Sequence, residues 1–131
     1  MMDKYGFKKF NEDCDFMREV LVENNIKNVF EAQAFINTSD GHDKVYYAVF
    51  CEANDGKKFV FSFYGKNGFK LRYKVDRFGL NFPENSIMAI VNKRVERGYI
   101  ICGSFKSEFI HFSDASFNKY IRYVDKLLEA M

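Results

Sequence analysis

Two glycine-containing turns divide the middle of the chain into three runs in which apolar and polar side chains alternate. Residues 54–56 read Asn-Asp-Gly and residues 66–68 read Lys-Asn-Gly, and both the Asp-Gly and Asn-Gly pairs favour tight hairpins because they readily take positive φ. The run 58–64 places three phenylalanines on one side, and the run 69–75 alternates apolar residues with three cations. This pattern restricts the segment to an antiparallel sheet with one apolar face.

Helical and further strand patterns flank these hairpins. We expect Asn11 to cap a helix over about residues 12–24, and the alternation in residues 28–36 predicts a strand with Phe30 on the same side as Ala32. Pro83 suits the first turn of a helix that ends near Arg97. Two short strands at 99–102 and 108–112 precede a last helix, which Ser113 would cap.

These expectations add up to one fold class. The sequence predicts an α+β fold: a mainly antiparallel β-sheet packed against a central helix, with additional N- and C-terminal helices. A chain of 131 residues with one proline and no low-complexity tract is expected to form a single domain over residues 1–131. The start of the chain leads into no apolar signal core, and no uncharged run approaches the length of a membrane span, so we expect a cytoplasmic protein without membrane contact.

Charge is distributed unevenly along the chain. Residues 57–106 contain eleven Lys or Arg against three acids, whereas the rest of the chain contains nine basic residues against fifteen acidic ones. Clustered cations repel one another, and a polyanion would relieve that repulsion. The alternative is a strand whose lysines and arginines are simply solvated.

The residue types that carry catalysis or hold metals are sparse. Cys14, Cys51 and Cys102 show no close spacing, His42 is best explained as part of a polar loop, and His111 has no evident partner, so we expect neither a metal site nor a cofactor. No phosphate-binding loop, nucleophile elbow or paired-carboxylate spacing stands out. We therefore expect no catalytic residues and no enzymatic activity.

Residues 43–99 resemble the WGR domain, a family named for its Trp-Gly-Arg motif. The resemblance lies in an order of features: a tract containing Lys44 and Tyr46, the polar turn 54–56, the aromatic strand 59–61, the motif Tyr64-Gly65-Lys66-Asn67-Gly68, and the basic helix end 92–99. Tyr64 stands where the family has Trp, and Lys66 where it has Arg. Lys lacks the planar fork of Arg, so recognition of phosphate by Lys66 would be less directional.

The WGR resemblance implies contact with nucleic acid, since the domain contributes to DNA-break recognition in poly(ADP-ribose) polymerases. Carried over, the contacts fall to Tyr64 and Lys66, while the basic hairpin and the helix end supply further cations. The full set of candidate nucleic-acid-binding residues is Tyr64, Lys66, Lys70, Arg72, Lys74, Arg77, Lys93, Arg94 and Arg97. The last three would also complement the helix dipole without any ligand.

A second function class stays open. A short chain rich in Asn, Lys, Phe and Tyr is typical of phages and mobile elements, and such a protein would act as a protein-binding inhibitor or adaptor on a host nucleic-acid-processing (defence) complex. In this hypothesis the acidic residues of the first helix, Glu12, Asp13, Asp15 and Glu19, would meet a basic groove. The sequence does not separate DNA from RNA, and exposed aromatic residues would also permit a homodimer.

Overall fold

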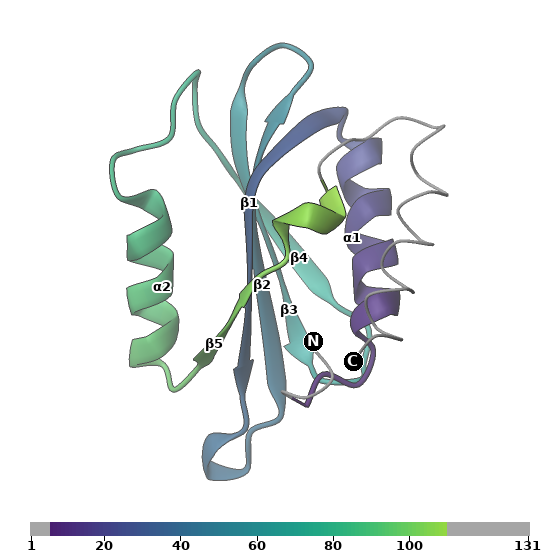
Figure 1. The fold of residues 1–131 in the computed structure, drawn as a ribbon, viewed down its shortest axis with the longest axis vertical. Coiled ribbons are helices and arrows are strands. Elements are labelled where there is room, and N and C mark those ends of the chain that lie inside the picture. Colours follow the sequence, from purple (N-terminus) through teal and green to yellow (C-terminus); the bar gives the residue numbers. More distant parts are fainter. Residues whose placement is uncertain (1–5, 110–131) are drawn as a thin grey trace.

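The computed structural model describes residues 6–109, which form an α+β fold with a five-stranded antiparallel sheet between two helices (Figure 1). The order of the strands in the sheet is β4-β3-β2-β1-β5. The elements are α1 (Phe10–Glu23), β1 (Ile26–Asn37), β2 (Lys44–Ala53), β3 (Lys58–Lys66), β4 (Arg72–Arg77), α2 (Ser86–Glu96) and β5 (Ile100–Ser104). Two short 3-10 helices, η2 (Ser39–Gly41) and η3 (Lys106–Phe109), complete the described part.

The β2–β3 hairpin is regular along its whole length. The turn at residues 54–56 closes with a hydrogen bond from the amide of Ala53 to the carbonyl of Lys57, and Gly56 takes a φ of +85°. Each pair in the register then follows from the position of the turn, from Glu52 opposite Lys58 to residue 44 opposite residue 66. The expected hairpin is confirmed, and it fixes which side chains of the two strands share a face.

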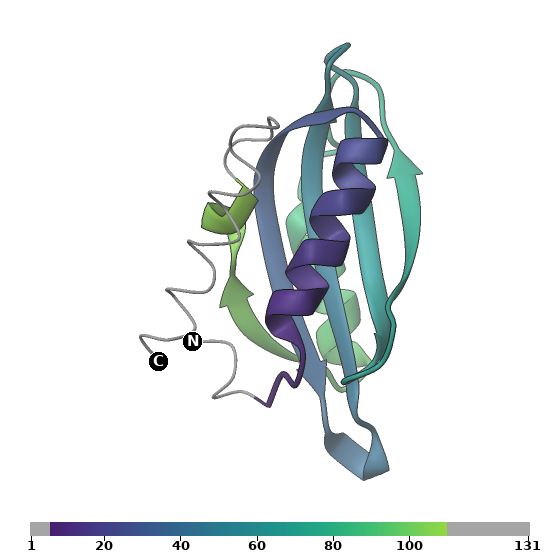
Figure 2. The same ribbon diagram turned by 90° about the vertical axis from the view of Figure 1, so that its right-hand side faces the viewer.

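Helix α1 covers one face of the sheet, which we call the α1 face (Figure 2). Met17 and Leu21 of the helix are fully buried against Val49 of β2 and Phe63 of β3. The helix begins at Phe10, with Lys9 as its N-cap residue and no capping side chain, so the expectation that Asn11 caps it is wrong. Phe10 is itself 4% exposed and contacts Phe105, and this packing extends the helix beyond the capping signal.

Helix α2 lies over the opposite face of the sheet, which we call the α2 face (Figures 1 and 2). A smaller cluster on this face contains Phe35 and Phe50, and Ile90 and Val91 of α2 pack against it. No residue of α2 is fully buried. The α2 face is therefore covered only in part, in contrast to the α1 face.

Strand β1 changes its pattern at a bulge. The register with β2 shifts between Val29 and Glu31, so Val29 and Ala32 lie in the α1-face core while Phe30 contacts Phe82 on the other side of the sheet. The expectation that Phe30 shares a side with Ala32 is wrong, because an extra residue in a strand shifts the alternation that follows it.

Two other expected strands differ from the observed ones. The second turn is longer than a tight hairpin: β4 begins at Arg72, and residues 67–71 form a loop. Residues 106–109 form η3 where a strand from 108 was expected, because this turn brings the ring of Phe109 to 5.3 Å from that of Phe105 in the core. His111, the rest of that strand and the helix expected after Ser113 lie outside the described residues.

Candidate nucleic-acid interface

Tyr64 lies near the end of β3 on the α2 face, directly opposite Tyr46 of β2. The two rings are stacked, with centroids 6.3 Å apart and planes inclined by 20°. Tyr46 is 6% exposed, whereas Tyr64 is half-buried and forms the outer member of the pair. The motif aromatic therefore presents its ring at the surface of the sheet, where a base or sugar can contact it.

Arg94, in the last turn of α2, adds a fixed charge to this pair. Its guanidinium carbon is 4.2 Å from the centroid of the Tyr46 ring and 5.6 Å from that of Tyr99. Burial raises the pKa of Tyr99, and the charge of Arg94 opposes that shift only in part, so the phenol stays neutral. Cation–π contact on two rings holds the planar guanidinium in place, and its donors suit a phosphate.

Three predicted cations lie on the same face of the neighbouring strands. Arg72 pairs with Tyr64 across β3 and β4, Lys74 pairs with Ser62, and Lys66 follows Tyr64 at the next position on the α2 face. All three side chains are exposed. The alternation of the strand thus brings the expected cations next to the motif aromatic.

Lys44 also belongs to this group, although sequence reasoning missed it. It is exposed at the start of β2 and lies directly opposite Lys66, so two like charges face each other across the strands. Such a pair is destabilising, and Asp43, whose pKa is lowered in part by the charge of Lys66, offsets some of the repulsion. The signal was present in the turn at residues 54–56, because its position alone sets residue 44 opposite residue 66.

We call Tyr46, Tyr64, Arg94 and the cations Lys44, Lys66, Arg72 and Lys74 the aromatic–cation surface. Within residues 6–109 none of these cations forms an ion pair; the observed pairs involve Lys8, Lys9, Arg18, Lys27, Lys57 and Lys58. Asp76 is exposed two positions beyond Lys74 on the same side of β4. The surface thus concentrates an excess of positive charge beside aromatic rings.

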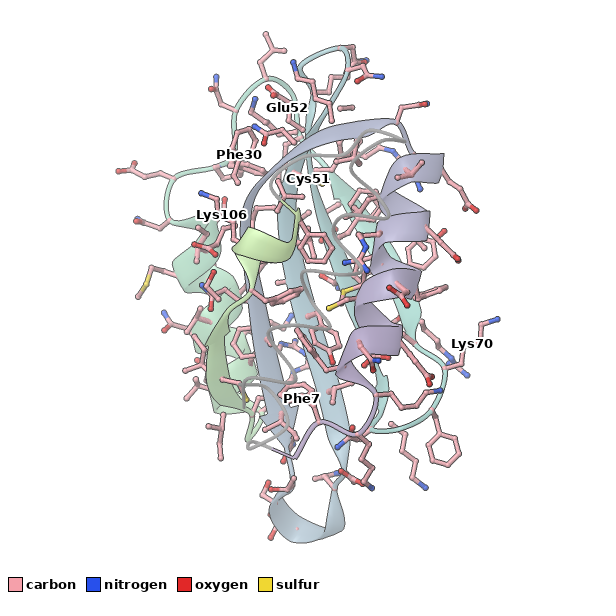
Figure 3. All side chains as sticks on the ribbon, turned by 45° about the vertical axis from the view of Figure 1, so that its right-hand side comes forward. Phe7, Phe30, Cys51, Glu52, Lys70 and Lys106 are labelled. Carbon is pink, nitrogen blue, oxygen red and sulfur yellow. The ribbon has the colours of Figure 1, made fainter. Side chains whose placement is uncertain are left out.

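The loop after β3 is held rigidly by Asn67, which is 2% exposed. Its amide nitrogen donates to the carbonyl of Gly6 and to Asp43 Oδ1 at 2.6 and 3.2 Å, and its Oδ1 accepts from the amide of Lys8 at 3.1 Å. Hydrogen bonds from Lys8 and Asn67 lower the pKa of Asp43. The anchored loop carries the exposed Lys70 at its outer side (Figure 3).

Two predicted site residues lie elsewhere. Arg77 pairs with Phe59, which packs on the α1-face core, so Arg77 belongs to the α1 face and does not join the aromatic–cation surface. The expected strand over residues 69–75 would place Lys70 on the same sheet face as Arg72. Lys70 instead precedes β4 and lies in the loop. Both differences from the expectation have a geometric cause. Arg77 is an odd number of positions from Arg72 and so lies on the opposite face, and the loop at residues 67–71 makes the strand begin after Lys70.

The remaining predicted cations lie beside Arg94. Lys93 and Arg97 are exposed at the end of α2, and Arg97 is close enough to Tyr99 for its charge to lower the pKa of that phenol against the effect of burial. The carbonyl of Arg97 accepts a hydrogen bond from the Asn37 side chain. Both side chains can extend the positive charge around Arg94.

The acidic residues of α1 do not form a free acidic surface. Asp13 is 7% exposed and accepts a hydrogen bond of 2.8 Å from the hydroxyl of Tyr47, and burial raises its pKa to about 6. Asp15 pairs with Arg18, and Glu12 pairs with Lys9. Of the four acids in the alternative hypothesis, three are thus engaged within the protein.

Groups suited to catalysis or metal binding are not assembled in the described part of the chain. Burial raises the pKa of Cys51 far above that of a free thiol and that of Cys102 to about 11, which disfavours thiolate formation. His42 is exposed in the loop after η2. No group of three or more His, Cys, Asp or Glu side chains within residues 6–109 is placed to hold a metal ion.

Comparison of the chain with protein-family models, curated proteins and solved structures finds no match. Among the helices of residues 6–109, none has both the length and the apolar character needed to cross a membrane.

Proposed function

We propose that the protein is a small, non-enzymatic nucleic-acid-binding module that acts through the aromatic–cation surface. One observation carries the proposal: cations that form no ion pair within residues 6–109 lie around the stacked pair Tyr46–Tyr64 on a single sheet face. Cations that contact phosphates release counterions, and the exposed ring of Tyr64 offers a stacking surface.

The proposal includes a divergent relationship to the WGR domain. It is supported by the position of the motif: Tyr64 and Lys66 share one face with Arg94, which lies in the helix that the resemblance pairs with the motif. As part of the same proposal, the sheet packs against a central helix, with further helices at both ends of the chain. The module would act in the cytoplasm on a DNA or RNA backbone.

The proposal predicts binding that weakens steeply with salt. Fluorescence anisotropy with short double-stranded DNA, single-stranded DNA and RNA at about 50 and 200 mM salt tests it, because several phosphate contacts lower affinity by orders of magnitude over that range. The triple variant Lys66→Ala, Arg72→Ala, Lys74→Ala should bind at least about tenfold more weakly and lower the salt slope by about 3.

A matched variant separates this effect from the change in net charge. Lys27 and Lys57 are exposed and Lys9 is half-buried; all three are ion-paired away from the aromatic–cation surface, and their replacement by Ala removes the same charge. This control should bind nearly as well as the wild type. Equal losses in the two triple variants, or no binding by the wild type at low salt, would overturn the proposal and favour the protein-binding alternative.

A further inference from the structure

The α2 face contains a second feature at its other end. A pocket of about 500 Å³ opens between the bulge of β1, strand β2 and the start of α2. It shares the sheet face of the aromatic–cation surface, and Figure 3 shows Phe30 at the opposite end of the sheet from Lys70. The volume falls within the range of about 300–1,000 Å³ that is typical of small-molecule sites.

Three aromatic rings from separate segments form the walls of this pocket. The Phe82 ring is 6.0 Å from Phe30 and 5.4 Å from Phe50, with interplanar angles of 88° and 73°. Phe30 reaches this position only because of the bulge between Val29 and Glu31. Together the three rings form an aromatic wall of the pocket, against which a flat molecule can pack.

The polar groups of the pocket argue against a phosphate as its occupant. Lys58 lies 4.9 Å above the Phe30 ring, but its charge is neutralised by Glu52 at 2.5 Å, and this hydrogen bond lowers the pKa of Glu52. Glu31 adds a carboxylate to the wall; its Oε1 accepts from the Ala32 amide at 2.9 Å and from the Ser104 hydroxyl at 2.6 Å. A neutral, flat group that donates hydrogen bonds fits better than an anion.

We propose that this pocket receives an unpaired nucleobase of a single strand whose backbone lies on the aromatic–cation surface. The inference rests on the proposed function and adds to it the strand type and the fate of one base. Positions 86 and 94 of α2 are about 12 Å apart along the helix axis, a span of about four stacked nucleotides. A base in a duplex cannot enter the pocket without leaving the stack, so single strands are favoured.

The carboxylate of Glu31 predicts which bases enter. Cytosine carries an amino group that donates to a carboxylate, whereas thymine offers a carbonyl oxygen at the same position. The two bases are of similar size and differ in this hydrogen-bonding group. Oligo-dC should therefore bind more tightly than oligo-dT, and Glu31→Gln should reduce that preference.

The test fills the pocket without touching the cations. Ile87 lines the pocket and is 39% exposed, so Ile87→Trp can place an indole in the pocket; Met88→Trp, at the next lining position, is a second variant. Val95→Trp is the matched control, because Val95 is 52% exposed on the same helix and does not line the pocket. Circular dichroism melts establish that each variant is folded.

The readout is anisotropy with labelled 12-nucleotide oligo-dC and oligo-dT and with a 12-base-pair duplex. Ile87→Trp should lower affinity for oligo-dC by about tenfold, the loss of one stacked base, and should leave duplex binding unchanged. Equal affinity of Ile87→Trp and Val95→Trp for oligo-dC would overturn the pocket assignment alone. Failure of the wild type to bind any of the three at low salt would instead overturn the proposed function.

Discussion

The two faces of the sheet differ in how completely a helix covers them. On the α1 face, aromatic and aliphatic residues are fully buried, and the buried carboxylate of Asp13 has a hydrogen-bond partner in Tyr47. On the α2 face, a helix without a fully buried residue lies beside cations that form no ion pairs within residues 6–109. Phe35, Phe50 and Val60 are buried on the α2 face as well, but the cover over them is incomplete, and its exposed part is available for binding.

The largest expected effect on stability comes from removing a buried ring from the α1 face. Phe63 is fully buried and lies within 6.1, 6.2 and 5.6 Å, between ring centroids, of Phe16, Phe61 and Tyr73. Phe63→Ala should lower the free energy of unfolding by about 3–5 kcal/mol, because it leaves a cavity. Lys74→Ala, on the α2 face of the next strand, should change it by less than about 0.5 kcal/mol. Urea denaturation of both variants measures the difference, and similar losses would show that the exposed cations of the aromatic–cation surface are needed for stability.

The buried carboxylate of the α1 face gives a pH-dependent prediction. Burial raises the pKa of Asp13 to about 6 from 3.8, against the hydrogen bond from Tyr47 and the charge of Lys9, and Glu12 raises it slightly further. A raised folded-state pKa means that this group's contribution is fully present below pH 3.8 and is lost as pH rises through about 6.

Asp13→Asn removes this titration and keeps an acceptor for the Tyr47 hydroxyl. The variant should gain about 1–2 kcal/mol relative to the wild type between pH 5 and pH 8, measured as the difference in unfolding free energy at the two pH values. Comparison with the wild type cancels the other titrating groups. A difference that does not change with pH would mean that the carboxyl is ionised in the fold throughout.

On the α2 face the largest single effect should come from Arg94. Arg94→Ala removes a charge held over Tyr46 at 4.2 Å, so affinity for nucleic acid should fall by about three- to tenfold and the salt slope by about 1. Arg77→Ala, which removes the same charge from the α1 face, is the control and should leave binding unchanged. If the two arginines proved equivalent in anisotropy titrations, binding would depend on net charge and not on the face.

The smallest predicted effects belong to Lys44, the cation that the sequence reasoning missed. Lys44→Ala should lower the salt slope by about 0.9, as for one phosphate contact. Without nucleic acid, it should stabilise the fold by about 0.2–1 kcal/mol, because the repulsion from Lys66 across the strands disappears. Lys44→Ala is therefore expected to weaken nucleic-acid binding and to stabilise the free protein. A loss of stability in the free protein would indicate that Lys44 has a structural role instead.

The sequence predicts the hairpin well because the turn and the alternation agree. Lys44 could have been added to the site by the same reasoning, since the turn at residues 54–56 sets it opposite Lys66. Its charge alone predicts Arg77 to be a nucleic-acid-binding residue, but alternation from Arg72 places it on the other face of the sheet. The position of the turn and the alternation along each strand are thus sufficient to assign both residues to a face.

Other features depend on contacts that no local pattern encodes. The bulge turns Phe30 toward Phe82, but the pattern of apolar and polar residues in the sequence gives no sign of it. The late start of β4 depends on Asn67, whose side chain bonds to Gly6 and Asp43, far away in the sequence. Likewise, the Arg94 contact with Tyr46 joins residues 48 positions apart, which periodicity cannot predict.

The hydrogen bonds of Asn67 also bear on the kinetics of encounter. Because the loop that follows Lys66 is already tied to Gly6 and Lys8, a partner meets it in a set conformation and need not order it. Ordering a flexible side chain on association typically costs about 0.5–1.5 kcal/mol. The rate at which a partner associates with this part of the surface should thus be limited by diffusion and charge attraction. The lifetime of the complex should depend on how many contacts must break together.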